Sequence, residues 1–190
     1  MNLIIRCKYP AVILFLISLF SCIPQSTKNE KQHYVWLANN SKFVLLPPKK
    51  IEKPMDMAQF ISASWQGGDF YFNAWVKADE NGIEMTLFNE LGANIGTLSY
   101  NEKLLNFSSP VFPKSLNPEY IVADFQFCFY KTDALRKALE ECGLVLEIDN
   151  SVRRIQKGND IIIEIELKKD TVIFKNNLRG YGYTLGGDFI

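Results

Sequence analysis

Apolar and polar residues alternate along two long stretches of the chain, which is the pattern of β-strands that bury one face. The strands of the first stretch are expected at residues 58–65, 69–77, 83–88, 94–100 and 104–107, and those of the second at 144–148, 153–156, 161–168, 171–175 and 180–185. Turn signals such as Gly67-Gly68 and Asn81-Gly82 separate neighbouring strands. The sequence therefore predicts about ten antiparallel strands in sequence-local hairpins.

Two of these strands alternate most regularly. In residues 69–77 one face is expected to carry Phe70, Phe72, Ala74 and Val76, and the other Tyr71, Asn73, Trp75 and Lys77. In residues 161–168 the inward positions are expected to be Ile161, Ile163, Ile165 and Leu167, with Glu164, Glu166 and Lys168 in water. Each strand thus has one face suited to a core.

Residues 117–143 interrupt the alternation and indicate two short helices after the fifth strand. Asn117-Pro118-Glu119 is a strong helix start, and Thr132-Asp133 is a second one. Gly143 is the residue type that most easily adopts the left-handed conformation at a helix end. Phe125, Phe127 and Phe129 also alternate as a strand would, but the capping signals favour helix. The residues alone therefore predict a β domain with a helical insert.

The N-terminus has the features of an export signal. Residues 1–21 contain a basic start and an uncharged apolar run that is too short to span a bilayer comfortably. Leu19, Ser21 and Cys22 resemble the lipobox of bacterial lipoproteins, in which the cysteine is diacylated and becomes the new N-terminus. A plain secretory signal, or a short membrane anchor in which Cys22 has no role, is the alternative.

The mature chain is expected to consist of a flexible tether and one domain. Residues 22–42 are mostly polar and are predicted to be the tether, with residues 34–37 as a stretch that can pack on the domain. Residues 43–190 are predicted to form the domain, because 47% hydrophobic and 13% aromatic residues argue against disorder. The two cysteines left there, Cys128 and Cys142, can pair in an exported protein, but two buried thiols are favoured.

Charge and composition argue against a nucleic-acid partner and against catalysis. Removing Arg6 and Lys8 leaves 19 of the 21 basic residues against 21 acidic ones, a net charge near −2. The only histidine, His33, falls in the predicted tether, so no histidine triad can form in the domain, and no Cys/His spacing suggests a metal site. We therefore expect no enzyme activity and no cofactor.

Asp124 is the one carboxylate to weigh as a catalytic group, since it stands among apolar neighbours and is a candidate for a raised pKa. The favoured alternative places it on the exposed side of its helix, or in an ion pair with Arg153 or Arg154.

Several short stretches resemble bacterial lipoprotein-sorting proteins. The strand and turn at residues 85–93 resemble the outer-membrane receptor LolB. Leu45-Leu46-Pro47-Pro48, Gly96-Thr97-Leu98-Ser99-Tyr100, Ala123-Asp124-Phe125-Gln126 and Leu178-Arg179-Gly180-Tyr181-Gly182-Tyr183 are similar to an uncharacterised family of LolB-like lipoproteins. This resemblance implies a mainly β (α+β) fold, in which a curved antiparallel sheet forms an incomplete barrel with an inserted two-helix lid.

The resemblance also implies a function, namely binding and transfer of lipid or lipoprotein cargo by a monomer on the periplasmic face of the outer membrane. The concave face would line a cavity for acyl chains or pack as a core; its candidate residues are Phe70, Phe72, Ile83, Met85, Leu87, Phe125, Phe129, Ile163 and Ile165. Leu91, at the tip of the Asn89-Glu90-Leu91-Gly92 turn, would protrude and touch membrane or cargo, unless it folds back onto its sheet. The alternative function is that of a structural lipoprotein of an envelope complex with a packed interior.

Overall fold

A computed structural model describes residues 32–65, 68–187 and 189, which all belong to one compact unit, Lys31–Ile190. Its main sheet contains ten antiparallel strands: β3 (Met55–Trp65), β4 (Gly68–Ala78), β5 (Ile83–Phe88), β6 (Asn94–Tyr100), β7 (Leu105–Ser108), β8 (Val145–Asp149), β9 (Val152–Lys157), β10 (Asp160–Leu167), β11 (Thr171–Asn176) and β12 (Tyr181–Gly186). The ten-stranded prediction is confirmed.

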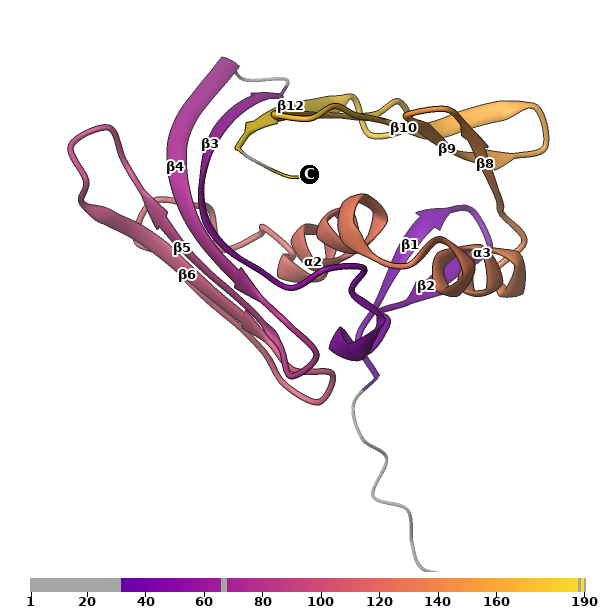
Figure 1. Cartoon of the computed structure of the whole chain (residues 1–190), viewed down its shortest axis with the longest axis horizontal. Coiled ribbons are helices and arrows are strands. Elements are labelled where there is room, and N and C mark those ends of the chain that lie inside the picture. Colours follow the sequence, from indigo (N-terminus) through magenta and orange to yellow (C-terminus); the bar gives the residue numbers. More distant parts are fainter. Residues whose placement is uncertain (1–31, 66–67, 188, 190) are drawn as a thin grey trace, which may run out of the picture. The chain divides into compact units, whose positions relative to one another are not determined.

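The strands are arranged in the order β7-β6-β5-β4-β3-β12-β11-β10-β9-β8. The last strand, β12, pairs with β3 and so joins the two blocks of hairpins in the middle of the sheet. The sheet curves without closing, and β7 and β8 remain as its two edges (Figure 1). The expectation of a mainly β fold with an open, curved antiparallel sheet is confirmed.

Two helices follow β7, as predicted: α2 (Pro118–Phe129) and α3 (Thr132–Glu141). The side chain of Asn117 caps α2 by accepting a hydrogen bond from the Glu119 backbone N–H at 2.9 Å. Gly143 ends the helical segment with a φ of 74°, a conformation that favours glycine. The strand-like alternation of the phenylalanines in α2 is therefore overridden by its capping signals.

The tether predicted for residues 22–42 is wrong from residue 34 onward. Tyr34–Ala38 and Ser41–Val44 form the antiparallel hairpin β1–β2, with a turn that contains Asn40 at a φ of 60°. Val35 and Phe43 are fully buried. The domain consequently begins before Phe43. Cys22 and the predicted signal peptide lie outside the described residues.

The hairpin explains why α2 is buried on all sides. Seven consecutive residues, from Val122 to Cys128, are buried in a helix of twelve. The curved sheet lies on one side of α2, and β1–β2 packs on another, with the rings of Phe43 and Phe127 4.9 Å apart (Figure 1). The expected lid is thus a helix that fills part of the concavity.

An arginine from the sheet holds the C-terminal end of α2. Arg153 of β9 donates hydrogen bonds from Nη1 to the carbonyl oxygens of Phe127 (2.9 Å) and Cys128 (3.1 Å). These are carbonyls of the last helical turn, which have no partner within the helix. Arg153 therefore takes the place of a C-terminal cap.

The structure differs from the prediction in two local details. A β-bulge between Ile161 and Ile163 turns Ile162 inward and leaves Ile161 38% exposed, so the expected inward position of Ile161 is wrong. Trp65 pairs with Gly68, which places Gly68 in β4 rather than in the turn. The remaining turn residues, 66–67, lie outside the described residues.

The two cysteines of the domain do not pair: Cys128 is buried and Cys142 half-buried, both as free thiols. The expectation of free thiols is confirmed, but the expected burial holds for Cys128 alone. Among the helices that the structure describes, none has the length and apolar character needed to cross a membrane.

Candidate functional site

A hollow of about 930 Å³ lies along the free edge of the sheet at β7. Its apolar lining comes from inward-facing side chains of β5, β6 and β7 and from the segment that leads to α2, namely Met85, Leu98, Leu105, Phe107, Phe112 and Leu116. Phe112 packs against Phe107 and Phe72, with ring centroids 6.2 and 6.0 Å away. One wall of the hollow is therefore continuous apolar surface.

Polar side chains complete the lining. They come from the outward face of the same three strands and from the segment before α2, and include Glu84, Thr86, Thr97, Ser99, Asn106, Ser108 and Lys114. Because successive side chains of a strand point to opposite faces of the sheet, these groups lie on the convex side and the apolar wall lies on the concave side, and the hollow extends around the β7 edge. A hydrocarbon ligand would therefore lie on the concave side, against the apolar wall.

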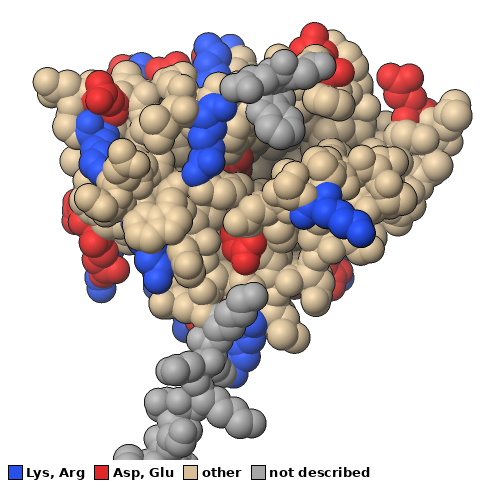
Figure 2. Space-filling view, turned by 180° about the vertical axis from the view of Figure 1, so that it is seen from behind, with Lys and Arg blue, Asp and Glu red and all other residues tan. Residues whose placement is uncertain are grey.

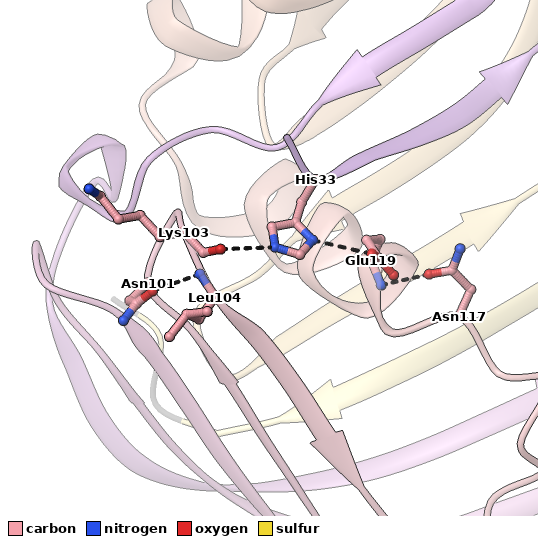
Figure 3. Close-up of polar contacts among 6 residues, drawn as sticks. All are labelled: His33, Asn101, Lys103, Leu104, Asn117 and Glu119. Atoms are coloured by element: carbon pink, nitrogen blue, oxygen red, sulfur yellow. Dashed lines mark hydrogen bonds and ion pairs between the residues drawn. The ribbon is translucent and has the colours of Figure 1, made fainter. Parts of the chain in front are cut away.

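His33 and Glu119 lie together in the lining of the hollow (Figure 3). His33 Nδ1 is 3.2 Å from Glu119 Oε1, and His33 Nε2 is 3.4 Å from the carbonyl oxygen of Lys103. Glu119 belongs to the first turn of α2, and Lys103 to the turn between β6 and β7. The imidazole thus ties the start of the described chain to both elements.

The placement of His33 corrects the prediction that it lies in the tether. The residue is only 8% exposed, and its ring packs edge-on against Tyr100, 6.2 Å away. Both ring nitrogens face acceptor oxygens of the protein. Among the described residues, neither ring nitrogen contacts a nucleophilic side chain. We therefore assign His33 a structural role, in which it connects the start of the described chain to α2 and to the β6–β7 turn.

Asp124 is buried in the middle of α2, not exposed or paired with Arg153 or Arg154 as favoured from the sequence. Tyr181 of β12 donates a hydrogen bond to Asp124 Oδ2 at 2.7 Å. Burial raises the pKa of the carboxyl to about 8, against the opposite effects of this hydrogen bond and of the nearby Arg179. Arg154 instead pairs with Glu164 at 2.9 Å.

Asp124 does not line the hollow. Its partner Tyr181 also accepts a hydrogen bond from Asn176 Nδ2 at 3.3 Å, so the carboxyl is part of a network that joins α2 to β11 and β12. The raised pKa expected from its apolar surroundings is confirmed, but the geometry gives the residue a structural role.

Four short stretches singled out in the sequence, residues 45–48, 96–100, 123–126 and 178–183, are connected by hydrogen bonds in the structure. Gln126 of α2 accepts a hydrogen bond from the backbone N–H of Leu46 (2.9 Å) and donates one to its carbonyl (2.8 Å). Tyr100 donates to the same carbonyl at 3.0 Å. The fourth stretch, residues 178–183, is joined to α2 by the contact between Tyr181 and Asp124. These stretches therefore fix α2 to both halves of the sheet.

The nine residues predicted to line a cavity do not surround one cavity in the structure. Ile83, Ile163 and Ile165 are at most 1% exposed and pack in the core, whereas Phe70 is 48% exposed. The others are buried or half-buried, and they are Phe72, Met85, Leu87, Phe125 and Phe129. Of the nine, Met85 alone belongs to the described lining of the hollow at β7.

Leu91 protrudes from the tip of the β5–β6 hairpin and is 93% exposed. Asn89 shapes this turn, because its side chain accepts hydrogen bonds from the backbone N–H groups of Leu91 (3.0 Å) and Ala93 (2.9 Å). Gly92 supplies the positive φ of 78° that the reversal requires. The expected exposure is confirmed, and the alternative in which Leu91 folds back is wrong.

Sequence reasoning missed the residues that form the apolar wall of the hollow. Phe107 was expected to be in a strand but had no assigned role, and Phe112 and Leu116 lie in an irregular segment without periodicity. The available signal was local: large apolar residues between Pro110, Pro113 and Pro118, where no regular element can bury them.

Charges of both signs are scattered over the face seen in Figure 2, between wide areas of uncharged side chains. This agrees with equal numbers of basic and acidic residues in the chain, 21 of each. No curated protein sequence matches the chain. A family model described as "Protein of unknown function (DUF3261)" matches residues 56–186, which run from β3 to β12. As this match covers more than half of the chain, the protein belongs to the DUF3261 family.

Proposed function

We propose that this protein is an outer-membrane lipoprotein that faces the periplasm and binds and transfers lipid or lipoprotein cargo without catalysing a reaction. The observation that carries the proposal is the hollow of about 930 Å³ with one apolar wall. That volume extends around the β7 edge, and its concave part is the space that the apolar wall borders. Acyl chains need apolar area more than hydrogen bonds, which the wall around Phe107 and Phe112 offers.

Two further features support a LolA/LolB-like half-barrel in this role. The sheet is open and antiparallel and holds a helix in its concavity. Leu91 is almost fully exposed on a hairpin tip, as the resemblance to the receptor requires. In this proposal Cys22 carries the lipid anchor, and the residues before the domain tether it.

A second candidate function is supported by the packing of α2. Phe125 packs against Phe129 and Tyr130, with ring centroids 4.9 and 6.4 Å away, and Ile163 and Ile165 are fully buried. An interior filled in this way suits a structural lipoprotein of an envelope complex. It differs from a carrier in having no cargo.

Phe112→Glu should weaken uptake of a fluorescent fatty acid at least tenfold, because an unpaired carboxylate in the apolar wall costs several kcal/mol on binding hydrocarbon. Val145→Glu is the matched control, since Val145 is half exposed on β8, at the opposite edge of the sheet from the hollow. Native mass spectrometry of the chain without its anchor tests the same site and should detect co-purified lipid. If the unmodified domain carries no lipid and takes up no fatty acid, the structural alternative is preferred.

Cys22→Ala should leave the protein unprocessed or soluble, because a diacylated cysteine is the kind of two-chain anchor that holds stably to a membrane. Labelling cells with a fatty acid before fractionation follows the modification directly. Retention of the Cys22→Ala protein in salt-washed membranes would identify a different anchor.

A further inference from the structure

Large apolar side chains are exposed at one end of strands β3 to β6. Leu91 is 93% exposed, and the others are between 48% and 59%; we call Phe60, Phe70, Tyr71, Leu91 and Val111 the apolar rim. Large exposed apolar clusters on soluble domains mark interaction sites more often than scattered single residues do. The rim therefore has the features of an interaction surface.

The strand register places these residues at the same end. β3 and β4 are joined between Trp65 and Gly68, and Asn73 pairs with Phe88 just before the β5–β6 turn. The end of β3 and the start of β4 therefore lie at the same end of the sheet as the β5–β6 turn; in Figure 1 these ends are at the top and at the upper left. Phe60 pairs with Asn73, and its ring stacks on Tyr71 with centroids 6.4 Å apart. Ser109 places Val111 at this end as well. Its hydroxyl donates a hydrogen bond to the carbonyl of Ile95, near the start of β6, and accepts one from the backbone N–H of Val111.

The rim has two sides, which identifies the chemistry of its partner. Phe70 lies on the face of β4 that carries the buried Ala74 and Val76, whereas Tyr71 lies on the opposite, outer face. A folded protein partner resting on one face of the sheet would leave the other side chain uncovered. A fluid lipid surface that receives the end of the sheet can surround both.

The rest of the chain is long enough to let the rim reach a membrane that also holds Cys22. The described chain starts beside Lys103, because His33 contacts its carbonyl, and the turn of Lys103 is at the end of β6 opposite to Leu91. The seven residues of β6 span about 24 Å. The ten residues from Ile23 to Gln32 span at most about 33–36 Å when fully extended.

We propose that the apolar rim inserts end-on into a lipid bilayer, with the hydrocarbon side chains on both faces of the β3–β4 hairpin in contact with lipid. Aromatic residues of this kind are favoured at the membrane interface, where their rings sit among headgroups. This inference rests on the proposed function, since it places the carrier where lipid cargo leaves or enters. It adds the surface and the orientation.

The test uses the domain Lys31–Ile190, which contains the whole described core, and vesicles of phosphatidylethanolamine and phosphatidylglycerol in equal parts. Leu91→Glu should lower partitioning into vesicles by roughly 10- to 150-fold, the equivalent of one leucine no longer buried in hydrocarbon. Phe70→Glu and Tyr71→Glu should each lower it as well. Leu104→Glu is the matched control, because Leu104 is also exposed (61%) but lies in the turn at the opposite end.

The orientation of the domain on the bilayer is measured separately, by an experiment whose result does not depend on small changes in stability. Brominated acyl chains should quench the fluorescence of the Leu91→Trp domain more than that of the Leu104→Trp domain, since the native tryptophans contribute equally to both. Equal quenching would overturn the end-on orientation. A loss for Tyr71→Glu without one for Phe70→Glu would indicate a one-sided surface and overturn the bilayer as partner.

The outcomes also separate this inference from the proposed function. Fatty-acid uptake in the absence of vesicles reports the hollow alone. If uptake persists while Leu91→Glu and Leu104→Glu partition like the unmodified domain, the rim is not a membrane surface, and the carrier proposal stands. If uptake is absent but vesicle binding depends on the rim, the protein docks on lipid and carries none.

Discussion

A chain that begins at Phe43 will not reach the native state, whereas a chain that begins at Lys31 will fold. The shorter chain lacks β1, and with it the fully buried Val35, the buried Leu37 and the contacts of His33 with Glu119 and Lys103. Each buried aliphatic side chain contributes about 1.5–3 kcal/mol. Since a whole domain is stable by only about 5–15 kcal/mol, these losses approach the total.

The loss also exposes what β1–β2 covers. Without its partner strand, β2 has no backbone pairing, and Phe43 is no longer held against Phe127 of α2. Urea unfolding followed by near-ultraviolet circular dichroism would compare the two chains. Cooperative unfolding of the Phe43 chain at a similar midpoint would contradict the role assigned to the hairpin.

Asp124→Asn should stabilise the domain at neutral and alkaline pH and abolish most of the dependence of stability on pH between about 4 and 8. The carboxyl has a pKa of about 8 in the folded protein and an ordinary value of 3.8, so the folded state retains a proton that the unfolded chain releases. Below pH 3.8 both states are protonated and the domain has its full stability. Between pH 3.8 and about 8, the free energy of unfolding falls by about 1.4 kcal/mol per pH unit.

Asparagine is uncharged at every pH and still offers an oxygen to the Tyr181 hydroxyl. Denaturant titrations at several pH values would give the slope for both proteins. Asp160→Asn is the control, because Asp160 is an exposed residue at the start of β10, and its replacement should leave the slope in place. An Asp124→Asn domain that is less stable than the original at pH 8 would show that the buried carboxylate is ionised and stabilised by Arg179.

Elements with local signals were predictable from the sequence. The Asn117 cap, the Gly143 stop and the Asn89 turn each depend on residues within a few positions, and the structure has all three. The exposure of Leu91 follows from the same local geometry. The inward face of β4 likewise follows from alternation alone.

Features that depend on distant partners were not predictable. β1 and β2 have the alternation of strands, but the polar residues before them favoured a tether, and only their packing on α2 reveals the buried face. Asp124 was expected to be exposed because nothing near it in sequence shows that Tyr181 supplies its hydrogen bond. The hollow depends on β7 being an edge strand, which follows from the pairing of β12 with β3 and not from β7 itself.

The central position of β12 also affects how the chain folds. Phe60 near the start of the sheet pairs with Gly186 near the end of the chain, so the two halves join only when the last strand is available. Contacts between such distant positions form slowly, because a long loop must close first. Until then β3 presents an unpaired edge to which any other extended chain can bind. During synthesis, the β3–β7 half is therefore complete in sequence long before its edge is protected, and aggregation at that edge competes with folding until Gly186 has emerged.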